Sequence, residues 1–446
     1  MFSRILIANR GEIAVRIIHT CQRMGVETVA VFSEPDREAL HVRLADAAVC
    51  VGPAESARSY LHIPSIVSAA EIANVEAIHP GYGFLAENAH FADICRSLDI
   101  EFIGPLSHAM EAMADKSQAR AVAEKGGVPI LPGSDGPVAD DDEAIAVVHR
   151  IGYPVMIKAC AGGGGRGVRV ARNDASLRSG LVQARAEAEA AFGDGSIYIE
   201  KLLDRPRHIE VQVLADNHGN AVHLGERDCS IQRRKQKLCE ESPSPTLDGR
   251  TRRHLCEAGL AVASACGYTN AGTVEFLYQD GQFYFLELNA RIQVEHPVTE
   301  LVTGIDIVEE QLRIASGEQL RHRQRDIAFR GHAIECRINA EDPDRNFAPC
   351  PGIIRLFVDP VGEGVRMDSH AYSGYVVPPH YDSLIGKMVA HGATRAEAIA
   401  RMQRALAELV VDGIKTTVPF HRALMANHRF TNNEFDLNFV DEFLGS

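Results

Sequence analysis

Hydrophobic runs and amphipathic stretches alternate along roughly the first 110 residues of the chain. The apolar run at 5–8 predicts a strand, and residues 12–24 carry apolar side chains at helical spacing. Further strands are expected at 28–32 and 77–78. Strands that alternate with helices in this way are typical of an open parallel sheet with helices on both faces. The N-terminal part is therefore predicted to be an α/β unit.

The rest of the chain predicts further packed units. A helix-rich segment at 115–125 is followed by turn-forming residues and then a small lid subdomain. An antiparallel sheet is expected from 208 to about 317, and a polar connection at 321–326 leads to another strand. Residues 395–411 have helical periodicity and belong to a C-terminal α+β part.

The length supports several domains, because 446 residues exceed what one hydrophobic core usually serves. The predicted fold class is multidomain, α/β and α+β. The predicted boundaries are 1–114, 115–330 with the lid at about 131–203, and 331–446.

Polar residues recur at every second position between 287 and 295: Glu287, Asn289, Arg291, Gln293 and Glu295. Successive side chains of an extended strand point to opposite faces, so these five groups are expected to line one face. The alternative is a solvated edge strand whose polar alternation has no function.

A second carboxylate is expected beside this row, because residues 273–278 predict a partner strand that contains Glu275. A three-residue loop at 280–282 places Glu275 directly opposite Glu287 on the same face. A two-residue Asp-Gly loop places them on opposite faces unless a bulge intervenes. Two carboxylates directly opposite each other repel, so a cation is expected between them. Together with the amide of Asn289 they are suitable ligands for Mg²⁺ or Mn²⁺ that bridges nucleotide phosphates.

A glycine-rich segment at 154–171 predicts a hairpin with a flexible tip. An apolar run containing Lys158 leads into four consecutive glycines, and no Gly-Lys-Ser/Thr follows. Glycines let backbone amides approach phosphate oxygens and let a loop close as a lid. The N-terminal strand-turn-helix lacks a G-x-G-x-x-G fingerprint, which disfavours a dinucleotide site.

The amino-acid composition limits the kinds of binding partner and the cellular location that can be expected for this protein. The net charge of −14 argues against nucleic acid, although the short basic run at 233–237 suits small anions. The ten cysteines show no C-x-x-C pair and are expected to be reduced thiols. With no signal peptide and no apolar stretch long enough for a membrane span, a cytoplasmic protein without membrane contact is expected.

Taken together, these residues closely resemble the biotin carboxylases of the ATP-grasp superfamily. The resemblance covers nearly the whole chain. It is carried by the glycine loop and by the strings at 5–14 (ILIANRGEIA), 79–88 (HPGYGFLAEN), 102–105 (FIGP), 226–234 (ERDCSIQRR), 291–300 (RIQVEHPVTE) and 335–342 (ECRINAED). It implies an N-terminal biotin carboxylase domain, an ATP-grasp domain and a biotin carboxylase C-terminal domain.

The resemblance also implies roles for matched positions. Contacts to ATP would come from Lys116, Lys158, Gly164, Gly165, Glu200, Lys201, Leu202, Leu203, His208, Gln232 and Lys235. Two Mg²⁺ or Mn²⁺ ions would be held by Glu275, Glu287 and Asn289. Bicarbonate and the reacting groups would be surrounded by Lys237, Arg291, Gln293, Val294 and Arg337, with Glu295 as the base and Arg337 also facing biotin.

These roles fit the chemistry implied by the family. Bicarbonate is a poor nucleophile, so a carboxylate must remove its proton as it attacks the γ-phosphate of ATP, while cations neutralise the developing charge. Two positions depart from the family pattern: Ala161 replaces a common glycine, and Lys235 replaces a nucleotide-facing histidine. Neither departure removes a metal ligand, the base or the cationic cluster.

The C-terminal end of the chain carries no Met-Lys-Met biotinylation motif, and its one Lys-Met pair, Lys387-Met388, lies inside a family string. Biotin is therefore expected on a separate carrier protein. The pattern resembles the biotin carboxylase subunit of bacterial acetyl-CoA carboxylase, a homodimer that works with a biotin carboxyl carrier protein and carboxyltransferase subunits.

Other functions remain open at this stage. Subunits that serve another acyl-CoA or pyruvate share the same half-reaction. A different ATP-grasp ligase would share the glycine lid and Glu275 with Glu287, but not the 291–300 string. A catalytically silent nucleotide-binding partner is expected to have lost Glu287, Glu295 or Lys237, and this chain keeps all three.

Overall fold

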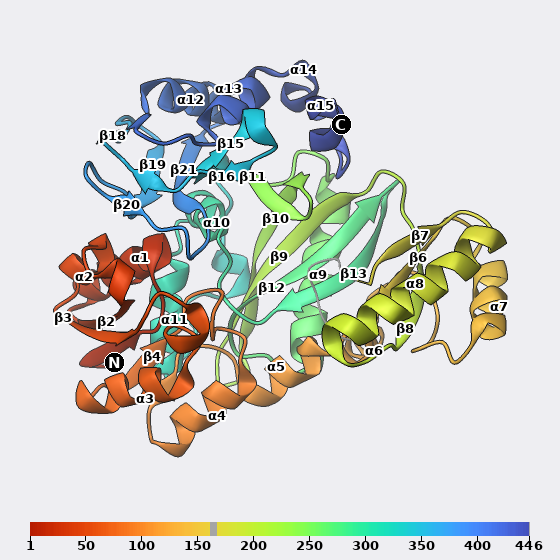
Figure 1. The fold of residues 1–446 in the computed structure, drawn as a ribbon, viewed down its shortest axis with the longest axis horizontal. Coiled ribbons are helices and arrows are strands. Elements are labelled where there is room, and N and C mark those ends of the chain that lie inside the picture. The colour runs from red at the N-terminus through yellow and green to blue at the C-terminus, as the bar shows by residue number, and fades with distance from the viewer. Residues whose placement is uncertain (161–166, 446) are drawn as a thin grey trace.

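The chain folds around one large sheet that is flanked by an N-terminal α/β unit and a projecting lid (Figure 1). The computed structural model describes residues 1–160 and 167–445, except the side chains of residues 116 and 117. Among the helices described, none is both long and apolar enough to cross a membrane.

The N-terminal unit is a five-stranded parallel sheet in the order β3-β2-β1-β4-β5. Its elements are β1 (Arg4–Ile7), α1 (Gly11–Met24), β2 (Glu27–Ser33), η1 (Glu34–Asp36), α2 (Leu40–Leu44), β3 (Ala47–Gly52), η2 (Ser56–Arg58), α3 (Ile63–Ile72), β4 (Ala77–His79), α4 (Ala89–Ser97) and β5 (Glu101–Phe102).

Both faces of this sheet are covered, as the sequence predicts. Ile5 and Ile7 pack in one core with residues of α1, whereas Leu6 packs in another with Ile66 of α3 and Phe91 of α4. This division follows from strand geometry, because neighbouring residues of β1 point to opposite faces.

Two helices, α5 (Ser107–Ala114) and α6 (Lys116–Lys125), lead to the lid. The lid packs a three-stranded sheet, in the order β7-β6-β8, against two helices. Its elements are α7 (Asp141–Ile151), β6 (Val155–Ala159), β7 (Arg169–Ala171), α8 (Asp174–Phe192) and β8 (Ile197–Lys201). The antiparallel pairing of β6 with β7 agrees with the predicted glycine hairpin, whose tip at 161–166 lies outside the described residues.

The large sheet has eight strands in the order β13-β12-β9-β10-β11-β14-β21-β19. Five of them come from the middle of the chain and three from its C-terminal part. The middle elements are β9 (Arg207–Ala215), β10 (Ala221–Arg233), β11 (Gln236–Ser242), α9 (Gly249–Ala265), β12 (Asn270–Gln279), β13 (Gln282–Asn289), α10 (His296–Thr303), α11 (Ile307–Ala315) and η3 (Gln324–Asp326).

The C-terminal part extends this sheet through β14, which pairs with β11. Its elements are β14 (His332–Asn339), β15 (Glu341–Asp342), η4 (Pro343–Arg345), β16 (Ala348–Pro349), β17 (Gly352–Ile353), β18 (Leu356–Val358), β19 (Val365–Ser369), β20 (Val376–Val377), β21 (Leu384–Gly392), α12 (Arg395–Glu408), β22 (Val410–Asp412), α13 (Val418–Ala426), α14 (His428–Thr431) and α15 (Phe439–Leu444).

The hairpin of β12 and β13 has a two-residue loop, Asp280-Gly281, and not the three-residue loop. A register shift next to Glu275 adds one residue to β13, so that Glu275 still pairs directly with Glu287. The structure thus takes the bulged form of the two-residue loop, in which the two carboxylates share a face.

Two sequence predictions about element ends are wrong. The strand that carries Glu287 ends at Asn289, so residues 290–295 form a bent connection to α10 and not a continuous strand face. The C-terminal helix ends at Glu408, and the next apolar residues form β22, which pairs with β18. The helical periodicity of the sequence continues across residues that pair in a sheet instead.

A buried ion pair network ties the N-terminal unit to the large sheet. Glu300 of α10 accepts hydrogen bonds from Arg16 of α1 at 2.8 Å and from Arg366 of β19 at 2.7 Å. Burial alone raises the pKa of Glu300, but Arg16 and Arg366 hold it below its ordinary value. The carboxylate of Glu300 therefore compensates part of the positive charge of both largely buried arginines.

We expect Glu300→Ala to lower the free energy of unfolding by about 3 kcal/mol, because it leaves two largely buried guanidinium groups short of a negative partner. Urea denaturation followed by circular dichroism measures this as a lower midpoint. The control is Glu38→Ala, which removes an exposed pair with Arg43 and should leave the midpoint unchanged. Equal midpoints for the parent and Glu300→Ala would contradict the role of this network.

Candidate active site

A cavity of about 1400 Å³ opens where the N-terminal unit, the lid and the large sheet meet. Tyr82 lines it from the N-terminal unit, Lys158 from the lid and Arg337 from β14. The predicted residues that line it are Lys158, Glu200, His208, Gln232, Lys235, Lys237, Glu275, Glu287, Asn289, Arg291, Gln293, Val294 and Arg337.

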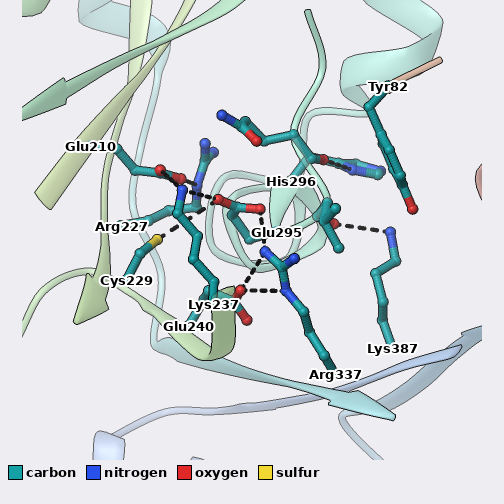
Figure 2. Close-up of polar contacts among 12 residues, drawn as sticks. Tyr82, Glu210, Arg227, Cys229, Lys237, Glu240, Glu295, His296, Arg337 and Lys387 are labelled. Carbon is teal, nitrogen blue, oxygen red and sulfur yellow. Dashed lines mark hydrogen bonds and ion pairs between the residues drawn. The ribbon is translucent and has the colours of Figure 1, made fainter. Parts of the chain in front are cut away.

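Lys237 of β11 is the centre of the charged groups in this cavity (Figure 2). Its ammonium lies 2.6 Å from a carboxylate oxygen of Glu210 and 2.6 Å from one of Glu295. Glu275 is 3.0 Å away. The side chain of Lys237 is 11 % exposed, so these contacts are made largely out of water. Burial lowers the pKa of Lys237, but the three carboxylates outweigh it and raise the pKa well above its ordinary value.

Glu295 lies between two cations. Its other carboxylate oxygen accepts a hydrogen bond from Arg337 at 2.9 Å. Burial alone would raise the pKa of Glu295, but Lys237 and Arg337 hold it well below the ordinary range of a glutamate. The side chain is therefore a fully buried carboxylate that stays ionised at neutral pH.

Behind Lys237, a fully buried arginine completes the charge balance. Arg227 of β10 pairs with Glu210 through a short contact and donates hydrogen bonds to Gln212 and Thr299. Sequence reasoning missed both Arg227 and Glu210. The signal was available in the strand 207–215, where Glu210 and Gln212 alternate with apolar residues, although alternation alone does not show that both faces are buried.

Glu275, Glu287 and Asn289 provide oxygen donors on the cavity side of the bulged hairpin. Register places Glu275 opposite Glu287, and Asn289 follows two residues later. Burial raises the pKa of Glu275, yet Lys237 and His208 hold it well below its ordinary value, so the carboxylate is ionised. Carboxylate and amide oxygens in this arrangement fit Mg²⁺ or Mn²⁺.

The bent connection 290–295 still brings Arg291, Gln293 and Val294 to the cavity wall, although it is not a strand, whereas Glu295 is fully buried behind that wall. Arg291 donates a hydrogen bond to Glu87 at 3.0 Å and another to Gln293 at 2.9 Å. The amide of Gln293 in turn lies 3.4 Å from Glu275. Side-chain contacts thus hold Arg291 and Gln293 beside the carboxylates after the strand has ended.

The far end of the cavity carries the predicted nucleotide residues. Glu200 of β8 pairs with Lys158 of β6 through a short contact and with Arg120 of α6. His208 contacts Glu275 at 3.0 Å and shares a hydrogen bond with Gln232. Arg120 was missed by the sequence reasoning.

Some predicted residues lie elsewhere. The side chains of Lys201, Leu202 and Leu203 are not among those that line the cavity, and the ammonium of Lys201 donates to the carbonyl oxygens of residues 152 and 153. Gly164, Gly165 and the side chain of Lys116 lie outside the described residues.

Lys235 occupies the tip of a tight hairpin. Arg234 and Lys235 form the two-residue turn between β10 and β11, and both have positive φ, 49° and 68°. Side chains with a Cβ rarely adopt this conformation, and such residues cluster at functional sites. The turn places Lys235 at the wall of the cavity.

Two opposed carboxyl groups lie behind Arg337. Glu240 of β11 pairs in register with Glu335 of β14, and it accepts a hydrogen bond from Arg337 at 2.6 Å. Within the described part of the chain, neither oxygen of Glu335 nor the second oxygen of Glu240 has a hydrogen-bond partner. Burial raises the pKa of Glu240 to about 7 despite Arg337, and it also raises the pKa of Glu335 well above its ordinary value.

Three family models match the chain in succession. The one described as "Biotin carboxylase, N-terminal domain" matches residues 1–110. "Carbamoyl-phosphate synthase L chain, ATP binding domain" matches residues 115–323, and "Biotin carboxylase C-terminal domain" matches residues 335–442. The three matches together span most of the chain.

Curated relatives agree over the full length. "Biotin carboxylase 1" of Bacillus subtilis is 54% identical over 445 residues, which are 99% of this chain and 99% of the relative. A pyruvate carboxylase subunit of Methanothermobacter thermautotrophicus is 53% identical over 443 residues, 99% of this chain and 90% of the relative.

Solved structures match as well and confirm the predicted fold class. A biotin carboxylase from Campylobacter jejuni in a β,γ-ATP complex has a TM-score of 0.96 at 51% identity, covering 99% of both chains. The biotin carboxylase domain dimer of the Hydrogenobacter thermophilus 2-oxoglutarate carboxylase has a TM-score of 0.94 at 47% identity, covering 99% of this chain and 98% of that one.

The raised pKa of Glu240 makes stability depend on pH. An ordinary glutamate titrates near 4.5, so the folded protein holds this proton more tightly than the unfolded chain does. The contribution of Glu240 to the free energy of unfolding is therefore complete below about pH 4.5, and it is lost as the pH rises through about 7.

We expect the stability of the Glu240→Gln variant to fall less with rising pH than that of the parent, because glutamine cannot ionise. Between about pH 5 and pH 7, the stability of the parent should fall relative to the variant by at most about 1.4 kcal/mol per pH unit. Urea midpoints measured across that range test the expectation. Exposed Glu408→Gln is the control and should follow the parent; a Glu240→Gln profile parallel to both would contradict the raised pKa.

Proposed function

This chain belongs to the biotin carboxylase family, and we propose that the residues gathered in its cavity carry out the family's reaction. The protein is an ATP-dependent ligase that carboxylates biotin with bicarbonate. The Hydrogenobacter thermophilus neighbour was solved with MgADP and bicarbonate. ATP, a divalent cation, bicarbonate and biotin are accordingly the substrates and cofactors of this chain.

The observation that carries the assignment of roles is the ionised, buried carboxylate of Glu295. It lies between Lys237 and Arg337, and Lys237 also contacts Glu275, one of the carboxylates that fit a metal ion. A carboxylate held ready as a base, beside cations that attract an anion, suits deprotonation of bicarbonate.

In the first step, Glu295 takes the proton of bicarbonate while a bicarbonate oxygen attacks the γ-phosphorus of ATP. The bond from that phosphorus to the bridging oxygen breaks, which yields carboxyphosphate and ADP. Lys237 and Arg291 stabilise the anion and the charge that develops as the new bond forms. Val294 also lines the cavity.

In the second step, the carbon–oxygen bond of carboxyphosphate breaks and gives carbon dioxide and phosphate. The phosphate accepts the proton of the ureido nitrogen of biotin, and that nitrogen attacks carbon dioxide. Arg337 stabilises the negative charge that forms on the ureido oxygen of biotin, because its guanidinium faces the same cavity.

The remaining residues of the site are proposed to bind ATP and its metal ions. Two Mg²⁺ or Mn²⁺ ions held by Glu275, Glu287 and Asn289 would screen the phosphates and polarise the transferred group. For Lys158, His208, Gln232 and Lys235, their place on the cavity wall supports contact with ATP. The assignments of Lys116, Gly164, Gly165, Glu200 and Lys201–Leu203 rest on the family pattern.

Biotin is proposed to arrive on a separate biotin carboxyl carrier protein. Lys387 of the Lys-Met pair is fully buried, so it is not available for attachment of biotin. We propose further that carboxyltransferase subunits pass the carboxyl group to acetyl-CoA, that the protein acts in the cytoplasm, and that it forms a homodimer. The dimeric state of the Hydrogenobacter thermophilus neighbour supports the last point.

The function is tested by measuring ATP hydrolysis by the purified protein. We expect hydrolysis to require bicarbonate and to be stimulated by free biotin. A different ATP-grasp ligase would hydrolyse ATP without either requirement, and a silent nucleotide-binding protein would not hydrolyse it. Capture of a small biotinylated protein, followed by assays with acetyl-CoA, propionyl-CoA and pyruvate, then identifies the acceptor.

We expect Glu295→Gln to bind MgATP about as tightly as the parent but to lose bicarbonate-dependent ATP cleavage by roughly 10²–10⁴-fold, because the amide keeps the size and removes the base. Calorimetry measures binding, and a coupled ADP assay measures turnover. Retention of more than about a tenth of the parent kcat at saturating bicarbonate would show that Glu295 is not the base.

We expect Glu287→Ala to abolish turnover and to weaken metal-dependent nucleotide binding by roughly 100-fold, since electrostatic stabilisation of this sort is often worth about 3 kcal/mol in a site. Nucleotide titrations with and without Mg²⁺ measure the effect. Gln282→Ala, at the exposed start of the same strand, is the matched control and should behave like the parent. Near-normal activity of Glu287→Ala at saturating Mg²⁺ would refute the metal assignment.

A further inference from the structure

Lys387 of β21 is a fully buried cation beside the proposed bicarbonate site. In the sheet it pairs directly with Arg337 of β14 on one side and with Asp368 of β19 on the other. Two like charges in directly opposed positions destabilise a sheet. Specific partners must therefore hold Lys387 and Arg337 side by side.

Those partners lie in the bent connection 290–295 and in the N-terminal unit. The ammonium of Lys387 donates a hydrogen bond to the carbonyl oxygen of Val294 at 2.9 Å. It also lies 3.0 Å from a carboxylate oxygen of Glu12, whose other oxygen accepts a short hydrogen bond from Tyr82. Lys387 thus joins three parts of the chain at one point.

Two neighbouring cations therefore hold two consecutive residues of this connection. Arg337 binds the side chain of Glu295, and Lys387 binds the backbone of Val294 (Figure 2). At the other end of the connection, Glu87 accepts hydrogen bonds from the backbone of Ala290 and from Arg291. Residues 290–294 lie outside regular structure and Glu295 is the N-cap residue of α10, so these contacts and the start of α10 together set the path of the connection.

We propose that Lys387 is a positioning residue for bicarbonate, which acts by fixing the Val294 carbonyl and with it the placement of Glu295. This inference rests on the proposed function. Besides its contact with Glu295, Arg337 also faces the ureido oxygen of biotin in that reaction. The contact of Lys387 is with a backbone carbonyl that takes no part in the proposed reaction, so it can hold the base in place while Arg337 contacts both Glu295 and biotin.

The rival explanation is that Lys387 and Glu12 form only a structural ion pair. Both explanations expect Lys387→Met to be destabilised, because it leaves the buried carboxylate of Glu12 without its cation. They differ for the double variant Glu12→Gln with Lys387→Met, which removes both charges. Replacing both members of a buried ion pair by neutral groups is often nearly neutral for stability.

The experiment measures urea midpoints and steady-state kinetics for the parent, Lys387→Met and the double variant. We expect kcat/KM for bicarbonate to fall roughly 10- to 100-fold in both variants, the size of effect that follows a small misplacement of reacting groups. The KM for ATP should stay within about threefold of the parent value. The midpoint should fall in Lys387→Met and return toward the parent value in the double variant.

Recovery of bicarbonate kinetics together with stability in the double variant would overturn the inference, as would unchanged kinetics in Lys387→Met. If Lys387→Met does not fold, the double variant alone decides between the two outcomes. A parent protein without bicarbonate-dependent ATP cleavage would instead refute the proposed function, which separates that failure from failure of the positioning role.

Discussion

The site depends on one electrostatic constraint, the burial of the Lys237 ammonium among three carboxylates. Taking such groups out of water costs several kcal/mol per ion unless each finds a partner. Arg227 compensates Glu210, and Arg337 compensates Glu295, so the cluster approaches neutrality without exposure to solvent. Removing any one member would take away one of the opposite charges that stabilise its buried neighbours.

The continuous sheet brings the oppositely charged groups of this cluster together. Lys237 and Arg337 come from β11 and β14, strands that belong to different parts of the sequence but pair directly. Register therefore fixes their separation more rigidly than packing between two independent domains would. The N-terminal unit and the lid flank this sheet, and the N-terminal unit is joined to it through Arg16 and Glu300.

The sequence predicted the parallel N-terminal sheet, the glycine hairpin and thirteen of the residues that line the cavity, because local periodicity and family strings carry that information. It did not predict that Glu287 and Glu295 lie on different elements, because the alternation of polar residues continues past the end of β13. Nor did it find Glu210, Arg227 or Glu240. Their importance comes from complete burial next to opposite charges, which only long-range pairing creates.

The position of Arg337 suggests how the two halves of the proposed reaction are ordered. Before bicarbonate reacts, the guanidinium is shared by Glu240 and the ionised Glu295. Once Glu295 has taken a proton, that partner is neutral, and the positive charge of Arg337 is less compensated although the side chain is largely buried. An anionic ureido oxygen of biotin is then its best available partner. In the proposed reaction, protonation of Glu295 in the first step would thereby raise the affinity of Arg337 for the negative charge that develops on biotin in the second.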